Sequence, residues 1–149
     1  MKRRSDRMAA LLQVFEHRLA VAGAAFAEAQ REVQSADAHA DAVGRQAASG
    51  RTMLARGARQ GMAAAEFRAV AAGVQVLGGE AHAARLAADE ALDTSTKARE
   101  ALLAQRVRVR ALEALRERDD RREQHARLRD EQRQLDEVGL RVAGRGELR

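Results

Sequence analysis

The sequence contains no proline, cysteine, tryptophan or tyrosine, and its only aromatic residues are Phe15, Phe26 and Phe67. Without proline, the chain lacks the commonest helix breaker. Without cysteine, it has no disulfide, no thiolate nucleophile and no cysteine-ligated metal, which favours a reducing compartment, and we expect a cytoplasmic protein. The scarcity of aromatic side chains argues against an ordinary compact core, which takes much of its buried area from them.

Helix-forming residues fill the chain instead. Hydrophobic residues make up 46% of the 149 residues and are mostly alanine, and charged residues make up 33%. Alanine, leucine, glutamate, arginine and glutamine in these proportions are typical of long helices or coiled coils. The length suits a single domain, residues 1–149. No apolar run approaches the roughly 18–20 residues that span a bilayer, so we expect no direct membrane insertion.

The first 18 residues also resemble a signal peptide, because basic residues precede the apolar stretch MAALLQVF. The charged residues Glu16-His17-Arg18 interrupt that stretch after Phe15, and a heptad pattern runs through it without a break. We therefore favour a helix over a cleaved signal.

Apolar residues alternate at spacings of three and four over five heptads near the N-terminus. This spacing is the signature of a left-handed coiled coil. The members of this first ladder are Leu12, Phe15, Leu19, Ala22, Phe26, Ala29, Val33, Ala36, Ala40, Val43 and Ala47.

A second ladder of the same spacing follows a glycine-containing stretch. Gly50, Gly57 and Gly61 fall within twelve residues, and each glycine costs a helix interior about 1 kcal/mol relative to alanine. We predict helix 1 over about 5–54, a turn over about 56–63, helix 2 over about 64–140 and a frayed end over 141–149. The second ladder consists of Phe67, Val70, Val74, Leu77, Ala81, Ala84, Ala88, Ala91, Ser95, Ala98 and Leu102, and it reaches Val109 and Leu112.

Two such ladders joined by a short turn predict an all-α fold, in which two long helices form an antiparallel coiled-coil hairpin and the second helix is the longer. If Ala55 faces Ala64, paired residue numbers add up to about 119, and residues after about Leu115 have no intramolecular partner. That remainder is highly charged and is expected to rely on pairs such as Glu117–Arg121 and Asp130–Gln134. It is either a solvated tail or a docking helix, and the sparse Leu128, Leu135 and Val138 favour docking.

No pattern in the chain predicts catalysis, so we expect a protein that is not an enzyme and uses no cofactor. The four histidines are far apart and lack metal-ligand spacing, and no phosphate-binding glycine motif is present. Basic clusters do occur, notably Arg45, Arg51, Arg56 and Arg59, and the whole chain carries a net charge of +5. These could hold phosphates, but the stacking aromatic residues of single-strand binders are missing, so nucleic acid is not the expected partner.

The chain resembles the FliJ and YscO family of stalk proteins, which serve type III export ATPases in flagella and injectisomes. The resemblance rests on the size, on the two-helix layout, on a glycine-bearing tip followed by Phe67, and on the C-terminal run RALEALRERDDRREQHARLRDEQRQLDEVGLR. The matching positions in that run are Leu112, Leu115, Arg118, Glu131, Gln132, Leu135, Asp136 and Glu137. The second helix lacks the aromatic residues that many members carry.

This resemblance implies a non-enzymatic central stalk that inserts into a hexameric export ATPase, activates it, and contacts the cytoplasmic domain of the export gate and secretion chaperones. It also implies a peripheral position at the base of a membrane export apparatus. The ATPase-binding positions that it implies are Leu11, Leu12, Phe15, Arg18, Leu128, Leu135, Asp136 and Val138. The gate-binding or chaperone-binding positions that it implies are Phe67, Val70, Val74 and Leu77.

Two other functions stay open from the sequence. One is a structural coiled coil that self-associates through its C-terminal part, and the other is a basic helical nucleic-acid binder. Whether the protein serves a flagellum or an injectisome does not follow from these residues.

Overall fold

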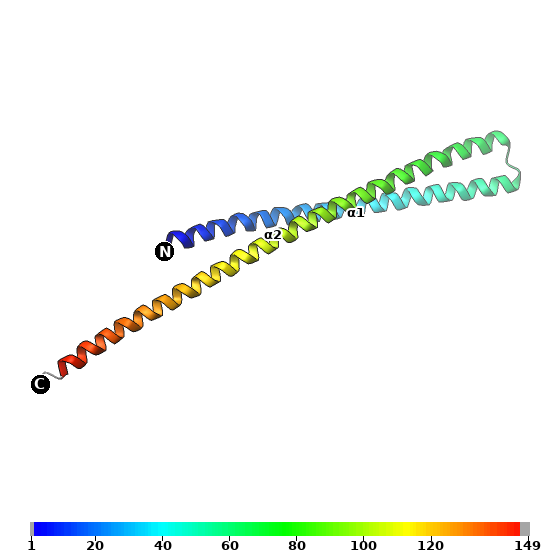
Figure 1. The fold of residues 1–149 in the computed structure, drawn as a ribbon. Helices are drawn as coiled ribbons and strands as arrows, with labels where there is room; N and C mark the ends of the chain where they lie inside the picture. The colour runs from blue at the N-terminus through cyan, green and yellow to red at the C-terminus, as the bar shows by residue number, and fades with distance from the viewer. Residues whose placement is uncertain (1, 147–149) are drawn as a thin grey trace. The chain divides into compact units, whose positions relative to one another are not determined.

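The computed structural model describes residues 2–146, with side chains over 6–141. It contains two helices, α1 (Lys2–Gln60) and α2 (Ala64–Gly146), and the described residues include no strand (Figure 1). The prediction of an all-α fold with a longer second helix is confirmed. The chain divides into two compact units, of which unit 1 comprises 1–17 with 106–149 and unit 2 comprises 18–105. Whether the chain acts as one domain stays a prediction.

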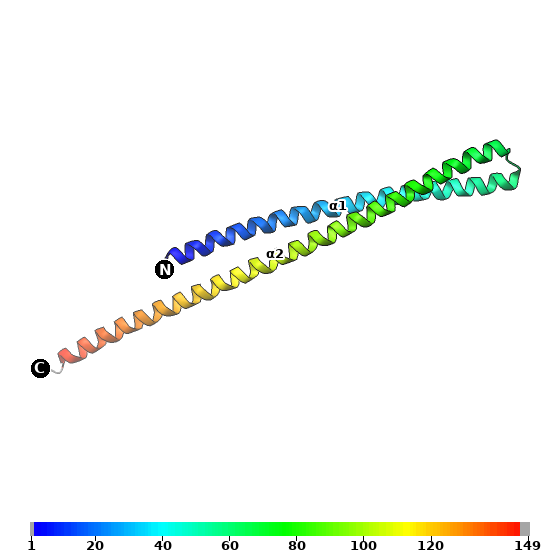
Figure 2. The ribbon, with the colours of Figure 1, turned by 45° about the horizontal axis from the view of Figure 1, so that its top comes forward.

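Unit 2 is an antiparallel helical hairpin. Its two helices run side by side from the turn in both ribbon views (Figures 1 and 2). Residues of the first ladder in this unit, from Leu19 to Ala47, are all buried or half-buried, as are those of the second ladder from Phe67 to Leu102. The heptad pattern therefore identified the buried seam between the helices correctly.

The turn of unit 2 is tighter than predicted. α1 continues to Gln60, and only Gly61 has a positive φ, at 80°. The amide of Met62 donates to the carbonyl of Gly57 at 3.0 Å. This bond, with a left-handed glycine between its partners, is the Schellman arrangement that ends helices. The predicted end of helix 1 near residue 54 was wrong, because only the last of the three glycines breaks the helix.

The two earlier glycines have close neighbours, which lie on α2 for Gly50 and in the turn for Gly57. A Cβ added at Gly50 would lie 3.0 Å from Val74 Cγ2, and one at Gly57 would overlap the side chain of Met62. Glycine at these positions therefore accommodates packing within the helix, at the usual cost of about 1 kcal/mol each in helix propensity.

The contacts of unit 2 fix the pairing register. Ala40, Ala84 and Ala88 form a buried cluster against which Ala36 packs, and Gly50 lies next to Val74. Paired residue numbers therefore add up to 124 rather than the predicted 119. The cause is the later turn, which is centred on Met62. The ion pairs from Arg85 to Asp37 and Asp41, at 3.8 and 3.9 Å, join the helices at the edge of the same seam.

With this register, layers of unit 2 combine a large side chain with a small one. Phe26 comes opposite Ala98, and Val43 opposite Ala81. Such alternation fills the space between helices without strain. Ala36 with Ala88 and Ala40 with Ala84 give two layers without any large side chain, so these layers bury little apolar area. The helices are therefore held closely but weakly at this point.

One seam residue of unit 2 is polar and unpaired. The Oε1 atom of Gln105 is buried and has no hydrogen-bond partner, and the register places Leu19 opposite it. A buried, unsatisfied carbonyl oxygen costs about 1–3 kcal/mol. In coiled coils, a polar residue in the seam fixes the register at the expense of stability. Gln105 therefore lowers the stability of the seam at this layer.

Unit 1 continues the same ladders. Leu12 and Val109 are buried, and Phe15 and Leu112 are half-buried. At a sum of 124, Leu12 comes opposite Leu112 and Phe15 opposite Val109. The first helical residue, Lys2, corresponds to residue 122. Leu115 is exposed, and the loss of pairing after it stays a prediction. We call residues 123–146 the arm.

The arm is helical to Gly146, so the predicted end of helix 2 near residue 140 was too early, and fraying from residue 141 stays a prediction. Residues 147–149 of the predicted frayed end lie outside the described residues. From Arg127 to Arg141 every side chain is exposed. The helix is supported by charge pairs one turn apart, as its alternating signs predict.

The charge pairs along this part of α2 are short-range and exposed. The predicted pair Glu117–Arg121 is confirmed at 3.0 Å, while the nearest basic partner of Asp130 is Arg133, at 4.0 Å. The arm also contains Glu123–Arg127, at 3.8 Å. Exposed pairs of this kind contribute about 0.3–0.5 kcal/mol each. They maintain the helix but do not determine what binds to it.

Candidate protein-docking surface

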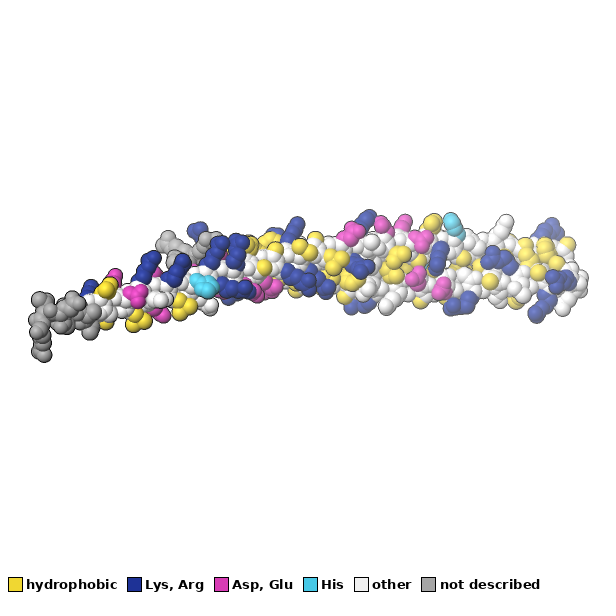
Figure 3. Space-filling model, turned by 60° about the horizontal axis from the view of Figure 1, so that its bottom comes forward, with side chains coloured by type: hydrophobic (Ala, Val, Ile, Leu, Met, Phe, Trp, Pro, Cys, Tyr) yellow, Lys and Arg dark blue, Asp and Glu magenta, His cyan; other side chains and the backbone are white. Residues whose placement is uncertain are grey.

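The arm exposes large apolar side chains to solvent. Leu128 is 60% exposed, Leu135 72% and Val138 57%. Together with Glu131 they follow the spacing three, four, three, so all four lie on one face of α2. We call these four residues the arm stripe. Figure 3 shows apolar side chains at this end of the chain among interleaved acidic and basic ones.

The arm stripe does not continue the hairpin seam. Extending the second ladder past Leu112 at the same spacing gives Arg116, Asp119, Glu123 and Ala126. Leu128 comes two residues after Ala126, a rotation of about 200° around an α-helix. The arm stripe therefore lies on the side of α2 that faces away from the seam. A longer α1 would leave it uncovered, so only a different chain or a different segment could cover it.

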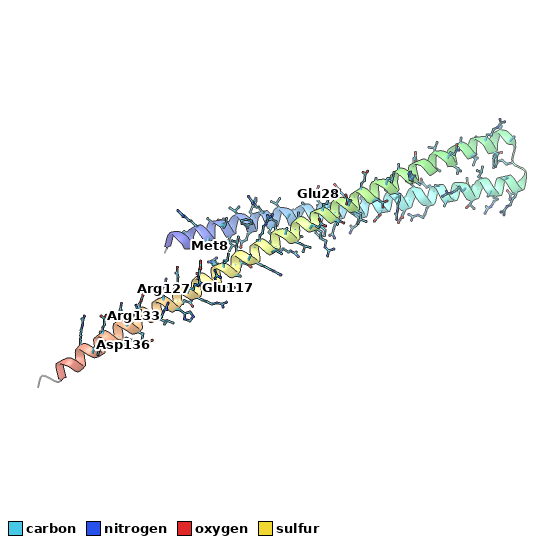
Figure 4. All side chains as sticks on the ribbon, viewed as in Figure 1. Met8, Glu28, Glu117, Arg127, Arg133 and Asp136 are labelled. Atoms are coloured by element: carbon cyan, nitrogen blue, oxygen red, sulfur yellow. The ribbon has the colours of Figure 1, made fainter. Side chains whose placement is uncertain are left out.

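The arm carries as many basic as acidic residues. Arg127, Arg133 and Asp136 lie along the last part of α2 in Figure 4. Between Arg116 and Arg141 the chain has eight basic and eight acidic residues. Net charge is therefore not what distinguishes this surface. Its distinguishing feature is the line of apolar side chains, since a solvated helix gains nothing from exposing them.

The other ATPase-binding positions implied by the resemblance lie in different environments. Leu11 is exposed, whereas Leu12 is buried in the seam and Phe15 is half-buried. Arg18 belongs to unit 2 and is exposed, as is Asp136 on the arm. Leu12 and Phe15 therefore stabilise unit 1 and have little surface left for a partner.

Sequence reasoning missed Val14 on α1. Val14 is 48% exposed and lies one turn from Leu11 on the same face of the helix. Its spacing from Leu11 is visible in the sequence, beside the longer ladder through Leu12 and Phe15. Leu11 and Val14 form a smaller exposed apolar surface within unit 1.

The implied gate-binding positions belong to the seam of unit 2. Phe67, Val70, Val74 and Leu77 are all half-buried. Val74 and Leu77 lie next to Gly50 of α1, within 4 Å of where its Cβ would be. Only the uncovered part of each of these side chains is available to a partner.

The basic residues near the turn of unit 2 are exposed. No acidic residue occurs between Asp41 and Glu66, while Arg45, Arg51 and Arg56 lie in that interval with Arg59. Arg59 lies in the last turn of α1, where a positive charge interacts favourably with the helix dipole. Of these four arginines, Arg59 is therefore placed to stabilise the end of α1.

The described residues contain neither a group of three metal-binding side chains nor a helix long and apolar enough to cross a membrane. Elsewhere on α2, Asp93 accepts a hydrogen bond from Lys97 at 2.8 Å, and this bond and the charge of Asp93 raise the pKa of Lys97.

Comparison with protein families matches residues 4–148 to the family described as flagellar FliJ protein. The chain belongs to this family. Membership makes it a flagellar export-associated protein, and FliJ proteins are structural components of the export machinery. The resemblance noted in the sequence is thereby confirmed over nearly the whole chain. No curated protein and no solved structure matches the chain.

Proposed function

We propose that this FliJ-family chain is a non-enzymatic stalk that binds and activates the hexameric export ATPase through its arm. The observation that supports this proposal is the arm stripe, an exposed apolar line on the face of α2 turned away from the seam. Amphipathic helices of this kind bind by laying their apolar face into a hydrophobic groove, with anchors at helical spacing. Leu128, Leu135 and Val138 have that spacing.

The position of the arm stripe allows binding without unfolding. Because it faces away from the seam, a partner can cover Leu128 and Leu135 while Leu12 and Leu112 stay in place within unit 1. Burial of each leucine is worth about 1.5–3 kcal/mol. The two leucines together therefore contribute at most about 3–6 kcal/mol toward binding, and a stable contact also needs the rest of the interface. Leu11, Val14 and Arg18 are the candidates for a second contact with the ATPase.

Links to the export gate and to secretion chaperones are part of the same proposal. They rest on family membership, and they involve the uncovered parts of Phe67, Val70, Val74 and Leu77. Because these side chains also pack in the seam, substitution there would change stability as well as binding. A test of this link therefore needs exposed neighbours such as Val76, which is 61% exposed.

Truncation after residue 123 tests the ATPase contact. The chain 1–123 keeps both ladders and the whole register from Lys2 onwards, so we expect it to retain its helical hairpin and its cooperative melting. We also expect it to lose the stimulation of ATP hydrolysis that the full chain gives to the purified cognate export ATPase. The measurements are the steady-state hydrolysis rate against added chain, and circular dichroism for folding.

The matched control is the full chain at the same concentration, with the ATPase alone as the baseline. A truncated chain that stimulates hydrolysis as strongly as the full chain would remove the arm from the proposal. A full chain that neither binds nor stimulates the ATPase would contradict the proposed function itself.

A further inference from the structure

The arm stripe has a charge pattern of its own. Its second member, Glu131, is an exposed carboxylate within an otherwise apolar line. One edge of the stripe is formed by Arg127, Gln134 and Arg141, which repeat every seven residues. The other edge carries Gln132 and Gly139, neither of them charged. Between residues 127 and 141, one side of the stripe therefore carries two arginines, the other side carries no charge, and the middle carries a single negative charge. Glu123, one turn before Arg127, is the acidic neighbour of the basic side.

This pattern disfavours pairing with a second copy of the chain. Two arms aligned in parallel and in register would bring Glu131 against Glu131 in the centre of the contact. Two antiparallel arms, with Leu128 opposite Val138, would bring Arg127 against Arg141 at the edge. Like charges in these positions destabilise helix pairs, and burial increases the cost. The natural occupant of this surface is a different protein.

We infer that the arm stripe docks in an apolar groove of another protein, that the groove wall beside Arg127 and Arg141 is acidic, and that a basic residue of the groove meets Glu131. This inference rests on the proposed function, in which the groove belongs to the export ATPase. It adds the chemistry of the groove and the orientation of the helix in it. Complementary charge along one wall of the groove fixes the orientation of the arm about its helix axis.

Arg127 is available for such a contact at small cost. Its side chain is 77% exposed and forms an ion pair with Glu123, at 3.8 Å. An exposed pair of this kind is worth about 0–1 kcal/mol, so exchange for a carboxylate of the partner loses little. A guanidinium can bind that carboxylate through two parallel hydrogen bonds, which fixes the geometry as well.

Charge reversal tests the acidic wall. The variant R127E/R141E changes the basic edge of the stripe, and the matched control R129E/R133E makes the same change in net charge on the opposite face. Each variant also removes one surface ion pair, with Glu123 or with Asp130. We expect R127E/R141E to raise the Kd of the full chain for the cognate export ATPase about tenfold or more, and the control less than about threefold. Raising the salt concentration should weaken wild-type binding and narrow the difference between the variants.

A second measurement uses Glu131. Replacing this residue with leucine makes the stripe apolar throughout and removes the central repulsion between two copies. We expect the wild-type chain to sediment as a concentration-independent monomer, and E131L to show a weight-average mass that rises with concentration toward a dimer. A wild-type dimer that dissociates in L128D/L135D would overturn the inference.

The outcomes separate the two proposals. If the wild-type chain does not bind the ATPase, the proposed function fails, and the groove assigned here fails with it. If the wild-type chain binds but R127E/R141E and R129E/R133E weaken binding equally, the function stands and the acidic wall is wrong. A larger loss in R127E/R141E than in its control, together with a monomeric wild-type chain, supports the inference.

Discussion

Replacing Leu128 and Leu135 together with aspartate is expected to abolish stimulation of the export ATPase and to weaken binding about 100-fold or more. Burial of the two leucines in the groove would contribute about 3–6 kcal/mol to the free energy of binding. Each 1.4 kcal/mol corresponds to a factor of ten in affinity. Aspartate removes this contribution and adds charges that must be desolvated. Both residues are exposed in the free chain, so the helical content and the melting temperature should stay close to those of the wild type.

Leu140 provides the matched control for a single substitution. It is 73% exposed, against 72% for Leu135, but it lies on the seam side of the helix. We expect Leu135→Asp to raise the Kd about tenfold or more and Leu140→Asp to raise it less than about threefold. Equal losses in the two variants would show that general apolarity of the arm, rather than one face, is what binds.

Among the substitutions considered, replacement of Ala88 with aspartate is expected to cause the largest loss of stability. Ala88 is 2% exposed and lies in the buried cluster with Ala40 and Ala84. A carboxylate there must either stay buried or push the helices apart. Burying an uncompensated charge costs several kcal/mol, so we expect the free energy of unfolding to fall by about 3 kcal/mol or more. Thermal and urea unfolding, followed by circular dichroism, measure the change.

The neighbouring Ala87 is exposed and provides the control. Aspartate at this position should cost about 0.5–1 kcal/mol, which is the difference in helix propensity from alanine. If the A87D and A88D variants melt at the same temperature, Ala88 is not in a tight seam and the register derived for unit 2 is wrong.

The sequence predicted the seam well because the seam arises from a local pattern, the regular spacing of apolar residues along each helix. Each ladder residue is placed by helix geometry alone, so the spacing identified Ala40, Ala84 and Ala88 without knowledge of the contacts. The register depends on one additional fact, which is the residue at which α1 ends. Three glycines compete for that role, and only Gly61 adopts a positive φ. The sequence placed the end of α1 about six residues too early. For this reason it predicted that paired residue numbers add up to 119, whereas they add up to 124.

The candidate surface was predicted in part. Leu128, Leu135 and Val138 were identified as exposed anchors because the hairpin offers them nothing to contact, and all three are exposed. Their position on the side facing away from the seam was missed, although counting onward from Leu112 would have revealed it. Leu12 and Phe15 were assigned to a partner by resemblance alone. Family resemblance indicates which segment is used, but it does not show whether a given side chain is already packed.

The most direct test measures which face of the arm the export ATPase covers. The chain has no cysteine, so Leu128→Cys and Ala126→Cys each introduce a single reactive thiol, one on the arm stripe and one on the seam side. Alkylation by a maleimide is followed with and without saturating ATPase. We predict that the ATPase slows alkylation at residue 128 about tenfold or more and at residue 126 less than about twofold. Equal rates at residue 128 with and without ATPase, or protection of residue 126 instead, would contradict this account.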